Sequence, residues 1–458
     1  MYLGDLHKFF TSPGAPLQVI DASNFVLSDD AVKATGALNP EFIDRMLEVR
    51  KMTPGLVPEI QQTVQEMTNM LKPTIDNAYS VFEIKPPPCR DIVIYDHGLD
   101  QLEFLKKNEC YVLHTRGEKI NLFILIKTIL KMGFYNLKNN YRIILIKHIK
   151  PKFIITYRCD NKLFYELKNQ IKGIKTILIQ WGKTIEEYFI HFKEKKNYFF
   201  VDQMYLYGDE TAKIFSKFIK GNTFSIGSIA NNRFKFGDEV EKDSLIFISQ
   251  AKSKRIFPEI EKIILKFLKS YCLKNNLKLY VSTRVLYNDE KGKKNYKNIL
   301  GETGWHYMPR KILDAPGDYE AYKRVMLSEY VVFIDSTLGY EALSRKKKVV
   351  AFPFGCISPE WCKKNYKTGF EKDNFYVPSK FGYPLNLEDE GEFWLSGYNL
   401  EKMNDKLNFI LNIDKDSWEK ILKKIGLEKV IKFDLYNDTL IKNLKTLGVP
   451  LKKDNLSK

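Results

Sequence analysis

The segment Asp335-Ser336-Thr337-Leu338-Gly339-Tyr340-Glu341 carries the clearest chemistry in this sequence. A strand predicted over 330–336 ends in a Ser-Thr-x-Gly turn, formed by Ser336, Thr337 and Gly339, that opens a helix. Backbone N–H groups, two hydroxyls and the positive end of the helix would converge there, where a phosphate could bind. Glu341, one turn into the helix, could accept hydrogen bonds from ribose hydroxyls. The same residues fit a plain N-cap equally well, with Glu341 completing a capping box.

A second polar turn, Ser249-Gln250-Ala251-Lys252-Ser253-Lys254-Arg255, follows the apolar run 244–249. Hydroxyls and cations at a strand end suit a diphosphate, which an Arg can bind through two hydrogen bonds. Ser249, Gln250, Lys254 and Arg255 are therefore candidate phosphate ligands, and an exposed basic loop is the equal alternative.

A third stretch, Gly304–Arg310, is expected between the sheet elements, where its backbone could hold the edge of a nucleobase. Arg310 joins the nucleotide-side candidates for this reason. The competing interpretation, that the aromatic residues beside Pro309 only pack in a core, is the stronger one.

Polar residues also follow three expected strands in the first half of the chain. They are Asp96, His97 and Asp100 after the first strand, Arg116, Glu118 and Lys119 after the second, and Gln180 after a later one. Because the carboxyl ends of parallel strands meet at one edge of a sheet, these residues are expected around one cleft facing the phosphate turns.

This cleft predicts general-base chemistry on an acceptor hydroxyl. Asp96, His97 and Glu118 are the candidate catalytic groups, and Asp100, Arg116, Lys119 and Gln180 are the candidate acceptor contacts. We favour Asp96 as the base because it ends an apolar strand, which would hold it rigidly. His97 is the chief rival, since its ordinary pKa already suits proton transfer at neutral pH.

Short β-rich runs alternate with amphipathic helices from Asp91 onward, which is the spacing of βαβ units. The pattern predicts an α/β fold with two Rossmann-like halves. Strands are expected at 92–96, 110–115, 153–157, 176–180, 223–228, 244–249, 277–283, 330–336 and 348–354, and helices at 120–132, 259–274 and 338–345.

Composition divides the chain into four segments. Residues 1–88, poor in Lys and Tyr, predict an N-terminal appendage with a helical stretch at 58–71 and a Pro-rich linker at its end. Residues 89–236 predict the first Rossmann-like, acceptor domain, and 243–430 the second, donor-nucleotide domain. Residues 431–458 predict a C-terminal helix and a basic tail.

Several classes of protein are excluded by missing motifs. The sequence contains no G-x-G-x-x-G, P-loop or G-x-S-x-G motif, which argues against dinucleotide oxidoreductases, kinases and α/β-hydrolases. Its six cysteines show no C-x-x-C spacing, so we expect reduced thiols in the cytoplasm and neither disulfides nor structural zinc. No membrane span and no secretory leader are expected.

The net charge of +17 is unevenly distributed. Residues 1–88 hold seven Lys/Arg and eleven Asp/Glu, net −4, which leaves +21 on the remainder. The lysines are scattered singly and form no RNA-binding motif, so nucleic acid is not an expected partner. A basic field of this kind would instead attract nucleotide phosphates, or a pyrophosphate-linked acceptor at an anionic membrane surface.

At these residues the chain resembles the LIC12162-type surface carbohydrate biosynthesis transferase family, over about residues 91–430. The resemblance rests on seven motifs, at Asp96–Asp100, Thr115–Asn121, Ile226–Ser228, Phe247–Gln250, Thr303–Trp305, Phe333–Leu343 and Phe381–Trp394. Where the family pattern reads Q-N-G, this chain departs from it with Gln180-Trp181-Gly182.

The resemblance implies a GT-B-like glycosyltransferase, with two Rossmann-like domains facing a cleft. It implies a nucleotide-activated sugar as donor and a glycan or lipid-linked acceptor, at the inner face of the bacterial membrane. No cofactor or metal is expected, because no D-x-D carboxylate pair accompanies the phosphate turns. Transfer of a polyol phosphate from a CDP-activated donor and a non-catalytic nucleotide- or glycan-binding scaffold stay open as alternatives, as does the oligomeric state.

Overall fold

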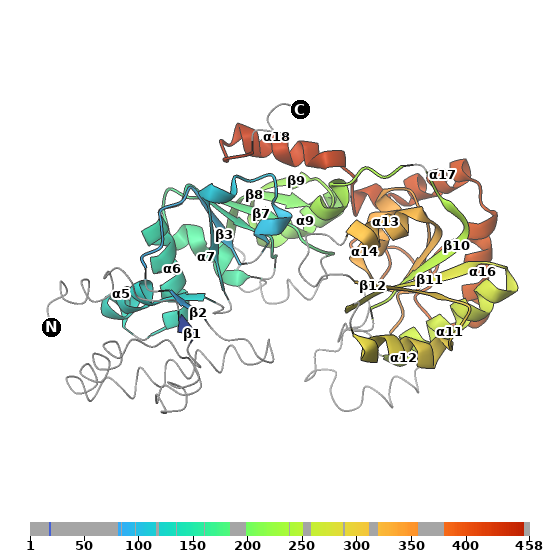
Figure 1. Ribbon diagram of the computed structural model, residues 1–458. Coiled ribbons are helices and arrows are strands. Elements are labelled where there is room, and N and C mark those ends of the chain that lie inside the picture. The colour runs from blue at the N-terminus through green and yellow to red at the C-terminus, as the bar shows by residue number, and fades with distance from the viewer. Residues whose placement is uncertain are drawn as a thin grey trace, which may run out of the picture. The chain divides into compact units, whose positions relative to one another are not determined.

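The computed structural model describes most of the chain from Val81 onward (Figure 1). The described residues are 18–19, 81–83, 85–96, 98–115, 119–133, 135–159, 161–183, 198–237, 239–250, 258–286, 289–310, 319–355 and 380–452. The helix expected at 58–71 and the tail beyond Lys452 lie outside them.

The first sheet has six strands in the order β4-β3-β6-β7-β8-β9. Their bounds are β3 (Ile92–Tyr95), β4 (Cys110–Leu113), β6 (Phe153–Thr156), β7 (Lys175–Ile179), β8 (Phe200–Leu206) and β9 (Lys220–Ser225). Strands β4, β3, β6 and β7 pair in parallel, as do β8 and β9. Every residue of β3 and β6 is buried, because helices cover both faces of a parallel sheet.

The connecting helices differ in their N-terminal caps, and only some of them begin at an Asn side-chain cap. They are α5 (Leu122–Met132), α6 (Leu137–Ile149), α7 (Lys162–Gln170), α9 (Asp209–Phe218) and α10 (Ile229–Asn232). The Asn121 side chain accepts a hydrogen bond from the Ile124 N–H at 3.1 Å, and Asn161 does the same for α7 at 3.4 Å. These caps fix the points at which the chain leaves the loops that follow the strands.

The second sheet is parallel throughout, in the order β12-β11-β10-β13-β14. Its strands are β10 (Glu241–Ile248), β11 (Lys278–Leu286), β12 (His306–Arg310), β13 (Ser328–Phe333) and β14 (Lys348–Ala351). Numbered along this sheet the order is 3-2-1-4-5, which is the Rossmann order. The segment Gly304–Arg310, expected between sheet elements, instead supplies the edge strand β12, so that expectation was wrong.

Helices lie on both sides of the second sheet. They are α11 (Pro258–Lys274), α12 (Glu290–Leu300), α13 (Tyr319–Leu327), α14 (Thr337–Ser344), α16 (Leu400–Asn412) and α17 (Lys415–Ile425). Helix α18 (Asp438–Thr446) follows them in the chain and is drawn beside β8 and β9 in Figure 1. Figure 1 shows α11 and α12 together on one side of this sheet and α13 and α14 on the other. The predicted α/β class with two Rossmann-like sheets is confirmed.

The chain forms two compact units. The first contains residues 1–99, 103–178 and 449–458, and the second contains 100–102 and 179–448. The chain end pairs within the first unit, where the Lys452 N–H donates to the Phe104 carbonyl at 2.9 Å. The boundaries expected at 89–236 and 243–430 stay a prediction.

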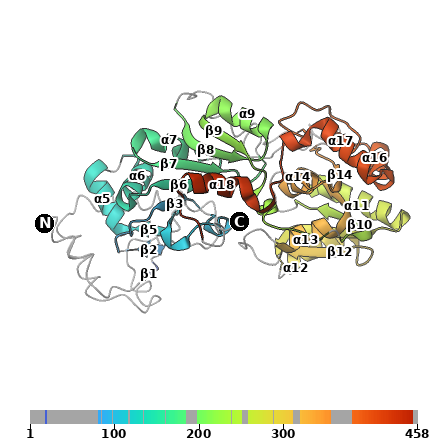
Figure 2. The same ribbon diagram turned by 90° about the horizontal axis from the view of Figure 1, so that it is seen from above.

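A small sheet joins residues before the Pro-rich linker to the first unit. Strand β2 (Val81–Glu83) pairs with β1 (Gln18–Val19) and, in parallel, with β5 (Lys119–Asn121). Lys119 forms an ion pair with Glu83 at 3.2 Å. Figure 2 shows α5 and α6 side by side next to these strands. Within the described part of the chain, no helix combines the length and the apolarity that crossing a membrane requires.

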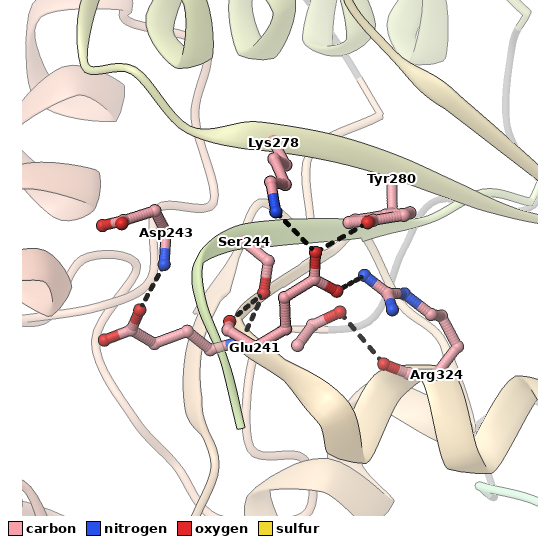
Figure 3. A network of polar contacts seen from close by, with 8 residues as sticks. Glu241, Asp243, Ser244, Lys278, Tyr280 and Arg324 are labelled. Atoms are coloured by element: carbon pink, nitrogen blue, oxygen red, sulfur yellow. Dashed lines mark hydrogen bonds and ion pairs between the residues drawn. The ribbon is translucent and has the colours of Figure 1, made fainter. Parts of the chain in front are cut away.

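The amino ends of β10, β11 and β13 are held by a charged network centred on Glu241 (Figure 3). Its carboxylate accepts hydrogen bonds from Arg324, from the Tyr280 hydroxyl at 2.8 Å and from Lys278 at 3.2 Å. The Arg324 guanidinium also lies 3.4 Å above the Tyr280 ring. This network lies at the sheet edge opposite the carboxyl ends where ligands bind, so its role is structural.

The network makes a prediction about acid stability. Burial alone would raise the pKa of Glu241, but the hydrogen bonds from Arg324, Tyr280 and Lys278 outweigh it and lower the pKa from 4.5 to about 2. A lowered pKa stabilises the fold above pH 4.5, and this stabilisation is lost as the pH falls toward 2. We expect Glu241→Gln to lower the free energy of unfolding at neutral pH by about 1–2 kcal/mol, allowing for solvent screening.

Urea unfolding at a series of pH values tests this expectation. The difference between wild type and Glu241→Gln should shrink as the pH falls from 4.5 toward 2. Glu392→Gln, a change at an exposed carboxylate, is the matched control. A difference that does not change with pH would contradict the assignment.

Candidate functional site

Strand order marks the place where each sheet can bind a ligand. In open α/β sheets, ligands bind at the carboxyl ends of the two strands between which the strand order reverses. In the second sheet these strands are β10 and β13, and in the first sheet they are β3 and β6. The strand-end residues predicted from the sequence include members at both positions.

The loops after β10 and β13 are joined by two hydrogen bonds. The Gln250 side chain accepts from the Asp335 N–H at 3.0 Å and donates to the Asp335 carbonyl at 3.2 Å. Both polar turns predicted from sequence therefore meet at the same point of the second sheet. The amide of Gln250 acts here as a connector between the turns.

Lys183, which sequence reasoning missed, anchors a third segment to this point. Its ammonium is 2.6 Å from the Asp335 carboxylate, 3.1 Å from the Tyr340 hydroxyl and 4.4 Å from the centre of the Tyr340 ring. Its backbone N–H donates to the Thr337 hydroxyl at 3.1 Å. The only sequence signal was its position directly after the Gln180-Trp181-Gly182 turn.

The Lys183–Asp335 pair is almost fully buried, with 8% and 5% of the two side chains exposed. Burial alone would lower the pKa of Lys183, but the charge of Asp335 and the hydrogen bonds outweigh it, so the pKa is raised. A cation is therefore held permanently beside the N-terminal end of α14. There it compensates the Asp335 carboxylate.

Ser336 and Thr337 lie at the start of α14, as the phosphate prediction requires. Ser336 is the N-cap residue, yet its side chain makes no capping hydrogen bond, so the alternative interpretation as a capping box is wrong. Gly339 serves packing: a Cβ there would lie 2.3–2.5 Å from the Phe333 ring of β13. The absent side chain lets the helix lie close against its own strand, as in dinucleotide-binding folds.

Glu341 is buried and bound by protein groups. Its two carboxylate oxygens accept from the Ser228 hydroxyl and, at 2.9 Å, from the Tyr322 hydroxyl. Burial raises its pKa, and the two hydroxyls and the charge of Arg345 offset only part of this rise. A ribose hydroxyl would have to replace one of these partners to bind Glu341.

Ser249 belongs to a second buried acid cluster. Its hydroxyl contacts both Glu261 and Tyr296, and the other Glu261 oxygen accepts from the Gln250 N–H at 3.0 Å. Burial raises the pKa of Glu261 from 4.5 to about 7, against the opposing hydrogen bonds. Sequence reasoning missed Glu261, whose only signal was its position in the first turn of an expected helix.

Asp96 lies at the reversal point of the first sheet. It has φ of +81° directly after β3, its N–H donates to the Leu113 carbonyl at 2.9 Å, and its side chain is 2% exposed. Its carboxylate is 3.3 Å from the Arg158 guanidinium, which follows β6 and was also missed. The next turn needs glycine at position 98, where φ is +110° and a Cβ would meet the Tyr157 ring at 2.9 Å.

The other predicted acceptor-side residues occupy different settings. Asp100 is exposed, and Lys119 is paired with Glu83 at 3.2 Å. Gln180 is buried and braces its own loop: it donates to the Gly182 carbonyl and accepts from the Tyr207 N–H, both at 2.8 Å. Outside the described residues are His97, Arg116, Glu118, Lys254, Arg255 and the side chain of Arg310.

No metal-binding cluster occurs in the described residues, where no three His, Cys, Asp or Glu side chains lie grouped around a common point. The arrangement there consists of a helix N-terminus, two hydroxyls and a buried cation at the second sheet, and a carboxylate beside a guanidinium at the first. Such groups can bind a phosphorylated ligand and accept a proton.

The partners of Glu341 predict a structural cost for its removal. We expect Glu341→Ala to lower the free energy of unfolding by about 2–4 kcal/mol, because two buried hydroxyls lose their acceptor. Tyr322→Phe, which removes one donor and keeps the ring, should cost about 1 kcal/mol in the same urea titration. Unchanged stability with weakened nucleotide binding would instead favour a ligand-binding role for Glu341.

The buried pair makes a second prediction. We expect Lys183→Met to lower the free energy of unfolding by about 3–5 kcal/mol, because the Asp335 carboxylate would stay buried without this cation. Adding Asp335→Asn to that variant should recover part of the loss, which a double-mutant cycle measures. Lys172→Met, at an exposed lysine, is the control. Additive effects of the two changes would argue against the coupling.

Several solved structures are similar to the chain over most of its length. They include an S. aureus MnaA–UDP co-structure (10% identity, 78% of this chain and 96% of that one, TM-score 0.42) and a glycosyltransferase from Rickettsia africae (13%, 81% and 99%, 0.42). The wall teichoic acid polymerase TagF, solved with CDPG, is a third (9%, 91% and 99%, 0.41). At these TM-scores and identities the likenesses do not decide which reaction the chain catalyses.

A family model described as "putative O-antigen biosynthesis protein" matches residues 177–448. No curated protein matches the sequence significantly. The matched region includes the whole of the second sheet, the Lys183 contact and both polar turns. Since it covers more than half of the chain, it confirms the predicted role in surface polysaccharide biosynthesis. The chain belongs to the O-antigen biosynthesis protein family.

Proposed function

We propose that this protein is a GT-B-type glycosyltransferase that moves a sugar from a nucleotide-activated donor to a glycan or lipid-linked acceptor. One observation carries the proposal: two polar turns are fastened together, through Gln250 and Asp335, at the strand-order reversal of a Rossmann-type sheet. This is the position at which such sheets bind nucleotides.

The donor would bind at the second sheet. The N-terminal end of α14 and the hydroxyls of Ser336 and Thr337 offer hydrogen bonds to phosphate oxygens. Lys254 and Arg255, which follow β10 in the sequence, are the proposed counter-charges for the leaving diphosphate. In this scheme cations and the helix dipole supply the electrostatic stabilisation, and no metal ion is required.

The acceptor would be activated at the first sheet. Asp96 would take the proton of the acceptor hydroxyl as that oxygen forms a bond to the anomeric carbon, while the bond from this carbon to the phosphate oxygen breaks. The nucleotide leaves with the electron pair of that bond. Arg158, 3.3 Å from Asp96, would orient the carboxylate. We also propose that the enzyme works in the cytoplasm, at the inner face of the membrane where lipid-linked acceptors are presented.

Ligand-induced stabilisation tests the nucleotide part of the proposal. We expect at least one of UDP, GDP, CMP and CDP to raise the melting temperature of the protein. Hydrolysis or transfer of the corresponding activated donor is then measured. Stabilisation by CDP or CMP with transfer of a polyol phosphate would favour the phosphotransferase alternative. Failure of every nucleotide to bind would favour a glycan-binding scaffold.

The choice of the catalytic base gives a further expectation. Asp96→Asn should lower the transfer rate by about 10²–10⁴-fold and leave nucleotide binding unchanged, because only proton transfer is removed. His97→Ala, assayed in parallel for both properties, should have the smaller effect. Normal turnover by Asp96→Asn would move the role to His97, or to Glu118 if both variants stay active.

A further inference from the structure

The hairpin formed by α5 and α6 has an unusual charge composition. Between Glu118 and Asp160 the chain contains no Asp or Glu, although the overall count of 56 in 458 residues corresponds to about five in a stretch of this length. The same stretch contains seven lysines and two arginines. The hairpin itself therefore supplies no acidic side chain to balance the positive charge of these residues.

The tip of this hairpin exposes three large apolar or aromatic side chains. Leu130 is 59% exposed, Met132 51% and Tyr135 86%, within six consecutive positions. Lys131 lies between them and is exposed as well. Most large apolar side chains of the described residues are buried, so three exposed ones at one tip need a physical reason.

Left-handed backbone conformations and a side-chain hydrogen bond define the turn at the tip. Gly133, with φ of +65°, ends α5, and Asn136 enters α6 from a left-handed conformation with φ of +48°. The Asn140 side chain donates to the Tyr135 carbonyl at 2.7 Å and fixes the turn. Behind the tip, the Tyr141 hydroxyl accepts from the Asn121 N–H at 2.8 Å. Figure 2 shows α5 and α6 side by side in the first unit.

Exposed apolar residues at the tip of a hairpin that carries lysines and no acidic residue have one chemistry that fits both features. Aliphatic side chains can enter the boundary between headgroups and acyl chains, and a tyrosine is favoured at the headgroup level. Lysines nearby gain energy from the negative surface potential of anionic lipids. Lys131 is exposed at the tip, and Lys147 and Lys150 are exposed at the other end of α6, where they can reach headgroups if the hairpin lies along the membrane. A tip of this composition suits an anionic bilayer better than an acidic protein surface, because its aliphatic side chains need an apolar environment.

We propose that the α5–α6 hairpin is an interfacial anchor that docks the protein on a membrane containing anionic lipids. The apolar tip enters the interface, and the lysines along the two helices bind the headgroups. This anchor would explain how the protein reaches the inner face of the membrane. It rests on the proposed function only for the reason that such an anchor is needed. Lipid binding is measured without transfer, so failure of the anchor and failure of the proposed reaction are separate results.

Co-sedimentation of the full chain with vesicles tests the anchor. Vesicles of phosphatidylcholine mixed with phosphatidylglycerol should bind the protein, and phosphatidylcholine vesicles should bind it weakly. The combined change Lys131→Gln, Lys147→Gln and Lys150→Gln should lower partitioning onto the anionic vesicles by about fivefold for each lysine that lies at the membrane surface, and so by up to about 100-fold. Binding of the wild-type protein should also weaken as salt is added.

A second variant separates insertion from charge. The combined change Leu130→Asn, Met132→Gln and Tyr135→Ser keeps the lysines, and it should lower binding to both kinds of vesicle. Two control variants alter exposed residues of the other unit: Lys291→Gln with Lys294→Gln, and Leu273→Asn with Leu400→Asn. Donor hydrolysis in solution and the melting temperature should be unchanged in all four.

Three outcomes would overturn the proposal. One is that the full chain does not bind anionic vesicles. Another is an equal loss of binding in the control variants, which would indicate nonspecific attraction by total charge. The third is a change of oligomeric state in the tip variant with unaltered vesicle binding, which would assign the hairpin to self-association of two copies.

Discussion

The buried contact between Lys183 and Asp335 is the interaction on which the second unit's strand-end region depends. It joins the loop after β7 to the turn after β13, and Gln250 joins the same turn to the loop after β10. Three loops that are distant in sequence thus share one acidic residue. A pair this deeply buried gains little net free energy, because both charges lose their hydration. Its value lies in specificity: other arrangements of these loops would bury one of the two charges without the other.

Strand order explains why chemistry gathers where it does in both sheets. At a reversal point the two neighbouring crossover helices leave in opposite directions, so the carboxyl ends of the strands stay uncovered. In the second sheet this opening contains the start of α14 and the hydroxyls of Ser336 and Thr337. In the first sheet it contains Asp96, with Arg158 beside it. The charged network around Glu241 lies at the amino ends of the strands (Figure 3). Residues that stabilise the second sheet and residues that can contact a ligand are therefore at opposite ends of its strands.

Sequence periodicity predicts the strands of both sheets well, because strands buried on both faces read as continuous apolar runs. It fails where that signal is diluted. Strand β8, with Asp202 and Gln203 in its middle, was not expected, and β12 was expected to be a connection. The candidate site divides in the same way. Polar residues directly after apolar runs were found, whereas Lys183, Glu261 and Arg158 were missed. Their importance comes from burial against residues far away in sequence, which no local spacing encodes.

Three acidic residues surround the place proposed for an anionic diphosphate, an arrangement that would be unfavourable if all of them were ionised. The negative charge of these residues is reduced or balanced in two ways. Asp335 is balanced by the ammonium of Lys183, 2.6 Å away. Burial raises the pKa of Glu261 to about 7 and raises that of Glu341 as well, so both carry less negative charge than exposed carboxylates would. The hydroxyls bound to them serve either protonation state, since a hydroxyl can donate or accept. The region is thereby rich in polar contacts that fix its loops, and its negative field is weaker than three fully ionised carboxylates would create. Acidic residues can therefore build the scaffold of an anion site, provided that burial or a fixed cation removes their charge.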